Sequence, residues 1–459
     1  MAPVELDALG PDGAYRARNR LTVTDVAGDP AVRLSLVPKL FIDRALAAAR
    51  RAETTPTDER VAALGRAGKL FASGTVEGLS ADDYELLVSR VAGMPISTVR
   101  AATRATADRA AEAYRSAAEA RPVGAVTDWR DPLTRTGRAV WVRRADVFAV
   151  HAPGNHPRVH GHWLEALALG YRVVVRPSRR EPLTPHRLVA ALRAAGFGDD
   201  EVMLLPTDHA AADDVLRGAD LGMVYGDDEV IGKHAGHTTV LPQGPGRSKI
   251  LITADVDWRA HLDTLVSSVA HHAGTACVNT TAVFVEGDPA PVAAAVAERL
   301  AALPSLPPED EKASLPVRPL ETARTLSALL ARRAEGTRPW LGGDGIADEL
   351  SDGSAVLRPA VHQLPDPHAP QAGVELPFPC VWVAPWTPDA GLGPLRNTLV
   401  LTAMTRDDRL LDRLLAEPTI GNVYSGQTPT WWLAPGVPHD RYLAEFLMRT
   451  KAVVRRRSD

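Results

Sequence analysis

The stretch that decides the fold is AVHAPGNHPRVHGHWLEALALGYRVVVRPSRREPLTPHRL, residues 149–188. A branched apolar strand ends in a Pro-Gly turn, a helical stretch follows near 160–169, and YRVVVRPS begins a second strand before another helix. The same alternation continues to residue 243 and gives about five strand–helix units. Such units predict a parallel sheet covered by helices on both faces, with the ligand crevice beyond the carboxyl ends of the strands.

The segments on either side extend this pattern. Upstream, Ala, Leu and Val recur at helical spacing, which predicts a helical prelude over residues 41–53, 59–73 and 97–120. Downstream, KILITAD (249–255) and TTAVFVEG (280–287) open a second set of strands and helices. We therefore expect an α/β fold of two lobes with a cleft between them.

The composition is that of an enzyme-sized globular protein. The 459 residues are 45% hydrophobic and 24% charged, which argues against a disordered chain, a fibre or a coiled-coil rod. The formal net charge of −4 argues against a general nucleic-acid or anionic-membrane binder. Cys277 and Cys380 are too few for a disulfide framework, and the sequence shows neither a membrane-length apolar run nor a secretion signal. We expect a cytoplasmic protein.

Cys277 is the first candidate for chemistry. It lies in HHAGTACVNTTAVFVEG, on a short turn between a helix that ends at Gly274 and a strand that begins near Thr280. A thiol has a reference pKa of about 8.5, so local donors or a cation must stabilise the thiolate before it can attack a carbonyl. The alternative is a small buried hydrophobic residue, which is also what Cys380 beside its apolar strand suggests.

Polar residues follow two neighbouring strands of the quoted stretch. The amide of Asn155, after an Ala-Pro-Gly turn, could donate hydrogen bonds to a developing oxyanion. Arg176, Arg179 and Arg180, after the next strand, could bind phosphate. The alternatives are a plain turn residue and a solvated basic loop. Histidines are also frequent here, but no cysteine or carboxylate spacing completes a metal site, so we predict no metal.

Taken together, these motifs resemble those of the aldehyde dehydrogenase superfamily. The family's order of motifs is matched by Asn155, Arg176-Pro177-Ser178, Tyr225-Gly226, Gly274-Thr275-Ala276-Cys277, and Glu375 with Phe378 and Pro379. The resemblance extends over about residues 40 to 455. It implies two Rossmann-like α/β lobes, one for the cofactor and one for catalysis, plus a small oligomerisation strand ribbon.

The resemblance also assigns domains and roles. Residues 1–124 and 148–246 would form the helical prelude and the NAD(P)-binding domain, residues 247–435 the catalytic domain, and residues 125–147 with 436–459 the ribbon and C-terminal segment. Cys277 would be the nucleophile, and Asn155 with the backbone N–H of Cys277 would hold the oxyanion. The cofactor-binding residues would be Arg176, Ser178, Arg179, Gly226 and Glu375. Homodimers or homotetramers would form through the ribbon.

Two departures from the family pattern refine the expected activity. Where hydrolytic members have a Glu that activates water, the segment LPQGPGRSK (241–249) has Gln243, which cannot act as a general base. The acyl-enzyme would then wait for a thiol, as in acylating members and in the fatty acyl-CoA reductases of bacterial bioluminescence, which this sequence also resembles. We therefore expect interconversion of an aldehyde and an acyl thioester, with coenzyme A or a carrier-protein thiol as co-substrate. Hydrolytic oxidation of an aldehyde to an acid and a cofactor-binding protein without catalysis remain the alternatives.

The second departure concerns the cofactor. Arg176 replaces the family's Lys, and Arg179 replaces the acidic residue that binds the ribose hydroxyls in NAD-preferring members. Arginines attract a 2′-phosphate that a carboxylate would repel. The resemblance thus favours NADP(H) over NAD(H).

Overall fold

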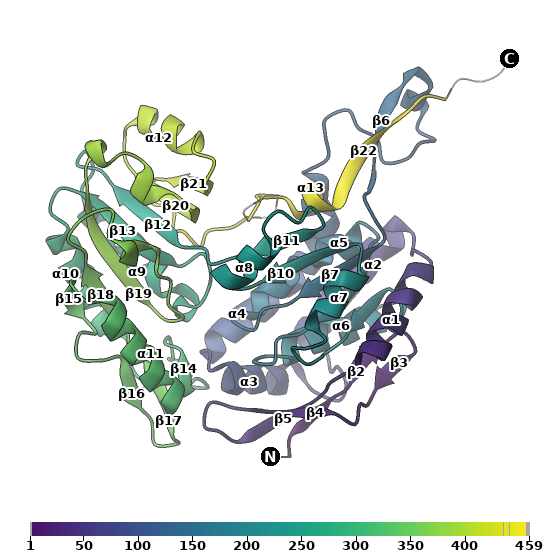
Figure 1. Ribbon diagram of the computed structural model, residues 1–459, viewed down its shortest axis with the longest axis horizontal. Helices are drawn as coiled ribbons and strands as arrows, with labels where there is room; N and C mark the ends of the chain where they lie inside the picture. Colours follow the sequence, from purple (N-terminus) through teal and green to yellow (C-terminus); the bar gives the residue numbers. More distant parts are fainter. Residues whose placement is uncertain (1, 435, 440, 456–459) are drawn as a thin grey trace.

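A computed structural model describes residues 2–434, 436–439 and 441–455, and within them the chain forms two lobes, each built on a seven-stranded sheet (Figure 1). The first sheet has the order β11-β10-β7-β8-β9-β2-β3. Its strands are β2 (Ala8–Gly10), β3 (Gly13–Tyr15), β7 (Val147–His151), β8 (Arg172–Arg176), β9 (Val202–Leu204), β10 (Leu221–Tyr225) and β11 (Val240–Gln243). The strands from β11 to β9 run parallel, as the strand–helix alternation predicts.

Helices cover both faces of the first sheet because its strands are apolar on both sides. Phe148 and Val150 pack into one core and Val147 and Ala149 into the other, in keeping with the two-residue period of a strand. One face is covered by α1 (Lys39–Arg51) and α7 (Ala212–Gly218), and the other by α2 (Thr57–Ser73), α4 (Ile96–Ala118), α5 (Leu164–Ala168) and α6 (Leu183–Ala194). The remaining helices of this lobe are α3 (Ala81–Ala92) and α8 (Asp228–His234).

The second sheet follows the same principle and has the order β15-β18-β19-β13-β12-β20-β21. Its strands are β12 (Ser248–Ile252), β13 (Thr280–Glu286), β15 (Arg338–Leu341), β18 (Ala360–Gln363), β19 (Cys380–Trp386), β20 (Thr398–Met404) and β21 (Ile420–Ser425). One face packs against α9 (Leu262–Ala270) and α10 (Ala290–Ala301), the other against α11 (Leu320–Arg333) and α12 (Asp408–Leu415). Cys380 is buried in that second core, where burial raises the pKa of its thiol, so it packs as expected.

The first third of the chain is less uniformly helical than its composition predicts. Before α1, residues 4–35 contain short strands, of which β2 and β3 extend the first sheet and β1 (Val4–Leu6), β5 (Pro30–Ser35) and β4 (Arg20–Thr24) form a sheet of their own. A further small sheet consists of β14 (Val317–Pro319), β17 (Ser354–Leu357) and β16 (Ala347–Glu349). It packs on the N-terminal region through Val26, Val317 and Val356.

A two-stranded ribbon projects from the first lobe (Figure 1). It pairs β6 (Arg138–Arg143) antiparallel with β22 (Met448–Val453), which follows α13 (Leu443–Leu447). The expected ribbon segment and C-terminal segment therefore lie side by side, while the domain limits themselves stay predictions. No helix in the described ranges is both long and apolar enough to cross a membrane.

Candidate active site

The carboxyl ends of the first sheet's strands align where the polar turns were expected. His151 at the end of β7 pairs with Arg176 at the end of β8 and with Val224 near the end of β10. The turns that follow β7 and β8 are in contact, since a Cβ atom placed on Gly154 would overlap the side chain of Ser178. Only glycine fits there, and the close packing fixes Asn155 at the start of the next turn.

The turn that carries Cys277 is strained. His272 (φ 51°), Ala273 (φ 58°) and Gly274 (φ 66°) are successive left-handed residues in η4 (His271–Gly274). Two of the three are not glycine, and such a conformation costs of order 1 kcal/mol or more for each residue with a Cβ atom. Asn279 holds the turn, because its amide donates to the carbonyls of Ser268, Val269 and His271 while its oxygen accepts from the N–H of Ala276.

Two distant segments support the same turn. A Cβ atom on Gly274 would overlap the backbone at Pro379, so the Gly-x-x-Cys segment and the downstream Phe-Pro segment pack directly together. On the other side, a Cβ atom on Gly246 would overlap the carbonyl group of Cys277, and the hydroxyl of Ser248 donates to that carbonyl at 3.1 Å. The sequence motifs thus meet around one cysteine.

Asn155 reaches this turn from the other lobe. Its Nδ2 donates to the carbonyl oxygen of Thr275 at 3.2 Å, which brings the two expected catalytic residues to one place in the cleft. The contact joins an element of the first sheet to an element of the second. An amide at this position can be redirected to an oxyanion on the carbon that Cys277 attacks.

Sequence reasoning missed His439, whose Nε2 lies 3.5 Å from the Sγ of Cys277. His439 lies in the segment between β21 and α13, and Asn422 donates to its backbone carbonyl. The ring of His162 packs edge-on against it, with centroids 4.8 Å apart. No spacing in the sequence links residues so far apart, so only the folded chain pairs this imidazole with the thiol.

Cys277 opens into a cavity of about 60 Å³. The described residues that line it are Asn155, His156, Arg158, Val159, His162, His272, Ala276, Cys277, Val278, Val400, Tyr424, Trp431, Trp432, Leu433 and His439. Among them there is no carboxylate, and one side chain, Arg158, belongs to a permanently charged type. The rest of the wall is aliphatic and aromatic, with imidazole rings between.

Burial keeps the neighbouring imidazoles neutral near pH 7. The pKa of His156 is lowered to about 3 and that of His271 to about 4, chiefly by burial and in part by the charge of Arg158. The pKa of His162 is likewise well below its usual value, chiefly through burial. No group of three or more His, Cys, Asp or Glu residues in the described part of the chain is placed to hold a metal ion.

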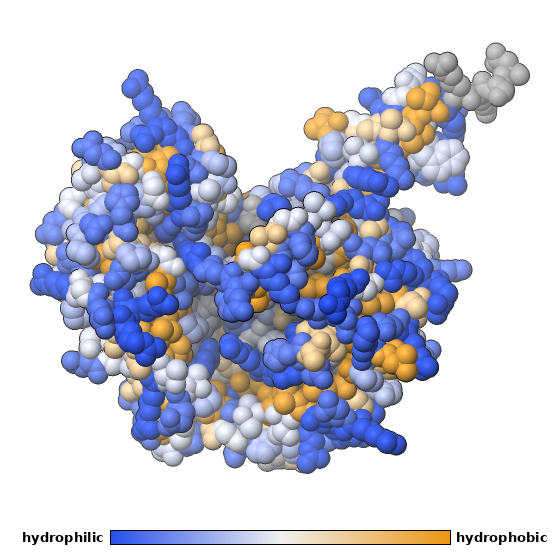
Figure 2. Space-filling model, in the orientation of Figure 1, coloured by the Kyte–Doolittle hydropathy of each residue, from blue (hydrophilic) through white to orange (hydrophobic). Residues whose placement is uncertain are grey.

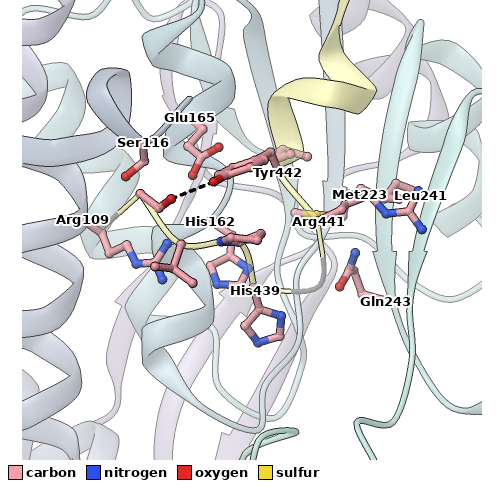
Figure 3. Close-up of a pocket in the computed structure, with 14 residues that line it drawn as sticks. Arg109, Ser116, His162, Glu165, Met223, Leu241, Gln243, His439, Arg441 and Tyr442 are labelled. Atoms are coloured by element: carbon pink, nitrogen blue, oxygen red, sulfur yellow. Dashed lines mark hydrogen bonds between the residues drawn. The ribbon is translucent and has the colours of Figure 1, made fainter. Parts of the chain in front are cut away.

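A second cavity adjoins the first through His162 and His439 (Figure 3). Gln243, the residue that stands where hydrolytic relatives would have Glu, lines this neighbouring cavity at the end of β11. Glu165 and Arg109 face it from α5 and α4. Burial raises the pKa of Glu165 to about 7, although the charge of Arg109 opposes the shift.

The expected cofactor residues lie at the carboxyl edge of the first sheet and in the cleft. The Nε atoms of Arg176 and Arg179 are buried and have no hydrogen-bond partner among the described residues, which fits an anionic group at this edge. Burial lowers the pKa of Arg176, and the charge of Arg179 lowers it further, whereas Asp213 raises it. A Cβ atom on Gly226 would overlap Val230, so the turn after β10 also requires glycine.

Glu375 lies where the two lobes meet. Its Oε2 accepts a hydrogen bond from the N–H of Arg247 at 2.7 Å, and burial raises its pKa to about 7 against the effect of that bond. The Arg247 side chain pairs in turn with Asp228 on α8 of the first lobe. The carboxyl group of Glu375 is therefore held at the cleft in a form that can accept or donate a hydrogen bond.

Two α/β lobes, each built on a mostly parallel sheet, place a cysteine turn opposite an amide across the cleft. The chain belongs to the aldehyde dehydrogenase family, whose family model, described as "Aldehyde dehydrogenase family", matches residues 24–392. The expected aldehyde dehydrogenase-like fold is confirmed by solved structures.

The chain is similar to aldehyde dehydrogenase 21 from Physcomitrella patens, solved with the reaction product succinate (TM-score 0.80, 18% identity, 99% of each chain covered). It is also similar to an indole-3-acetaldehyde dehydrogenase solved with NAD⁺ (TM-score 0.83, 19% identity, 98% of this chain and 96% of that one). In sequence it is 25% identical over 264 residues to a putative aldehyde-dehydrogenase-like protein, y4uC, of Sinorhizobium fredii. That match covers 54% of this chain, which spans 49% of the relative's length.

Proposed function

We propose that this protein is an NAD(P)(H)-dependent oxidoreductase that interconverts an aldehyde and an acyl thioester through an acyl group carried by Cys277. The observation that carries the proposal is the wall of the Cys277 cavity, which contains no carboxylate among its described residues. Without a carboxylate base, water is poorly activated and the acyl-enzyme persists until a better nucleophile arrives. A thiol of coenzyme A or of a carrier protein is such a nucleophile.

Each of the residues around Cys277 has a separate role in forming the acyl-enzyme. His439 accepts the thiol proton, and Sγ then bonds to the carbonyl carbon of the aldehyde. The amide of Asn155 and the backbone N–H of Cys277 donate to the resulting oxyanion. A bound nicotinamide cofactor would accept the hydride that leaves this same carbon. His439 then releases the first proton to solvent. In the second half, His439 accepts the proton of the incoming thiol, whose sulfur bonds to the acyl carbon as the bond to Cys277 breaks, and it returns that proton to the departing thiolate of Cys277.

The cofactor would be held by Arg176, Ser178, Arg179, Gly226 and Glu375. We propose a preference for NADP(H), because two arginines with unpartnered buried Nε atoms suit a 2′-phosphate better than a bare ribose. The Arg179→Glu variant would then favour NAD(H), as measured by kcat/KM for both cofactors.

Oxidation of an aldehyde to its acid is the second candidate. It is favoured by the position of His439, since an imidazole 3.5 Å from Sγ could also activate a water molecule. Both reactions use the same acyl-Cys277, so they differ only in what removes the acyl group.

Product analysis distinguishes the candidates. Purified protein would be given aldehydes with NADP⁺ or NAD⁺, with and without coenzyme A, and acyl-CoA thioesters with the reduced cofactors, with Cys277→Ala as the control. Thioester formed or consumed in a Cys277-dependent manner supports the proposal. Acid produced at the same rate without any thiol supports hydrolysis, and a Cys277 that neither turns over nor reacts with alkylating agents supports a cofactor-binding protein.

We further propose that the ribbon of β6 and β22 joins copies of this chain into a homodimer or homotetramer. Apolar side chains lie on the projecting arm (Figure 2), and Val123, Trp129, Leu133 and Val454 are exposed there. Exposed apolar side chains on a projecting arm favour a partner surface.

A further inference from the structure

Arg158 places a charge in the Cys277 cavity that no described residue balances through a hydrogen bond or ion pair. It lies in η2 (Pro157–Gly161), the turn that follows Asn155, and its side chain is partly buried in the cavity wall. Its backbone N–H donates to Nδ1 of His156. Its guanidinium group, however, has no hydrogen bond or ion pair with any residue that the structure describes.

The groups that face Arg158 leave its charge uncompensated. The charge of Arg158 acts on His156, His162, His271 and His272, and all four have a pKa lowered chiefly by burial and in part by Arg158. They are therefore neutral near pH 7 and add no counter-charge.

The nearest charged neighbours do not neutralise Arg158 either. Burial lowers the pKa of Arg158, and the charge of Arg109 lowers it further. Glu165 lines the second cavity, where its charge acts on Arg109, and it forms no ion pair with Arg158. The thiolate of Cys277 has the opposite effect and raises the pKa of Arg158. The guanidinium group of Arg158 is therefore close enough to Cys277 for their charges to interact.

We propose that Arg158 binds a carboxylate group of the substrate, so that the preferred aldehyde or acyl group carries a terminal carboxylate. The identity of the bound molecule as an aldehyde or acyl group rests on the proposed function, whereas the anion site does not. A partly buried guanidinium without a partner is costly, and its planar fork matches a carboxylate in two parallel hydrogen bonds.

The size of the cavity selects the kind of anion. Its volume of about 60 Å³ suits a small group, and one guanidinium balances the single charge of a carboxylate better than the two charges of a phosphate. Trp431, Trp432 and Val400 line the remaining wall and would contact a short apolar body between the two polar ends.

Alkylation of Cys277 tests this site without requiring turnover. Iodoacetate and iodoacetamide differ in little but the carboxylate, and the rate of modification of each would be followed at the Cys277 peptide by mass spectrometry. Any effect of Arg158 on the thiolate population changes both rates together, so it cancels in the ratio of the iodoacetate rate to the iodoacetamide rate. We expect Arg158→Met to lower this ratio about tenfold or more, the factor given by one charge-assisted hydrogen bond.

Three further variants complete the experiment. Arg158→Lys keeps the charge and should restore most of the ratio, Arg104→Gln removes an exposed charge from α4 and should leave the ratio unchanged, and Cys277→Ser gives the background. A ratio that is the same in the wild type and in Arg158→Met overturns the proposal, even if both rates fall.

Substrate kinetics then separate this proposal from the proposed function. A short aldehyde with a terminal carboxylate should show a KM about tenfold or more below that of its carboxamide analogue, and the difference should vanish in Arg158→Met. If neither aldehyde is turned over while the alkylation ratio depends on Arg158, the anion site stands and the proposed function fails. If both are turned over with equal KM and the ratio is insensitive to Arg158, the anion site fails.

Discussion

At the scale of single residues, the chemistry depends on how Cys277 loses its proton. His439 is the described imidazole in contact with Sγ, and the histidines on the other side of the cavity are kept neutral by burial. A neutral imidazole beside a thiol accepts its proton at a pH where an isolated thiol would keep it. In the proposed function His439 is therefore the base for the thiol of Cys277, whereas Gln243 lines the neighbouring cavity and cannot act as a base.

Removing His439 should slow both capture and release of the acyl group. We expect His439→Ala to lower kcat by roughly 10²–10⁴, the range typical of a lost general base. The pH dependence of iodoacetamide reaction at Cys277 should move to higher pH in the same variant. The exposed His209 provides the matched control, since His209→Ala removes an imidazole that does not line the Cys277 cavity. Wild-type rates in His439→Ala would contradict this role.

The raised pKa of Glu165 should make the stability of the folded protein depend on pH. Burial raises its pKa to about 7 in the folded protein, above the value of about 4.3 expected when unfolded. The folded state thus binds more protons between these values, so this contribution to stability is fully present below the unfolded pKa and is lost as the pH rises through 7. We expect Glu165→Gln to reduce the fall in Tm between pH 5 and pH 8, as measured by calorimetry. A steeper fall in the variant would show that the pKa is not raised.

At the scale of elements, the glycines of the motifs hold segments in close contact. The backbone at Gly246 abuts the carbonyl group of Cys277, and the backbone at Gly274 abuts Pro379. The Cys277 turn is thereby clamped between the segment that joins the lobes and the segment that precedes β19. This clamp maintains the left-handed conformation of His272 and Ala273, which an isolated turn would not adopt.

A methyl group at Gly246 should disturb this clamp. We expect Gly246→Ala to lower the free energy of unfolding by about 1–3 kcal/mol, as overpacking does, and to slow alkylation of Cys277. Gly232 on α8 is the control, because a Cβ atom there meets nothing within 4 Å, and Gly232→Ala should be neutral or slightly stabilising. Denaturant unfolding and iodoacetamide kinetics measure both effects. Equal behaviour of the two variants would show that the Gly246 contact is not required.

The helices and strands also show which parts of the fold could be predicted from the sequence. The strand–helix alternation from residue 149 onward was predictable because the period of apolar residues is a local property. The strands within residues 4–35 were not, since several have only three residues and depend on pairing with distant partners such as β9. Motif order brought Cys277 and Asn155 forward as candidates, whereas His439 and Arg158 became visible only when the fold placed them around the thiol.

At the scale of the whole molecule, the projecting ribbon is the feature that suggests association with another copy of the chain. Its strands β6 and β22 pair with each other, and exposed apolar side chains lie on the part that projects from the body (Figures 1 and 2). Edge strands of this kind are a ready surface for another chain. Association through the ribbon would also fix the C-terminal segment that carries His439, since β22 follows α13 directly.

The ribbon therefore leads to a prediction that couples assembly to activity. We expect the wild type to sediment as a dimer or tetramer, and the double variant Leu133→Glu with Val454→Glu to dissociate because charge replaces exposed apolar surface on the arm. Leu415→Glu on α12 adds a charge at a leucine that is even more exposed and lies away from the arm, and it should leave assembly intact. Sedimentation velocity measures the mass of each variant, and iodoacetamide kinetics at Cys277 report whether dissociation loosens His439. A wild type that sediments as a monomer at micromolar concentration would refute association through the ribbon.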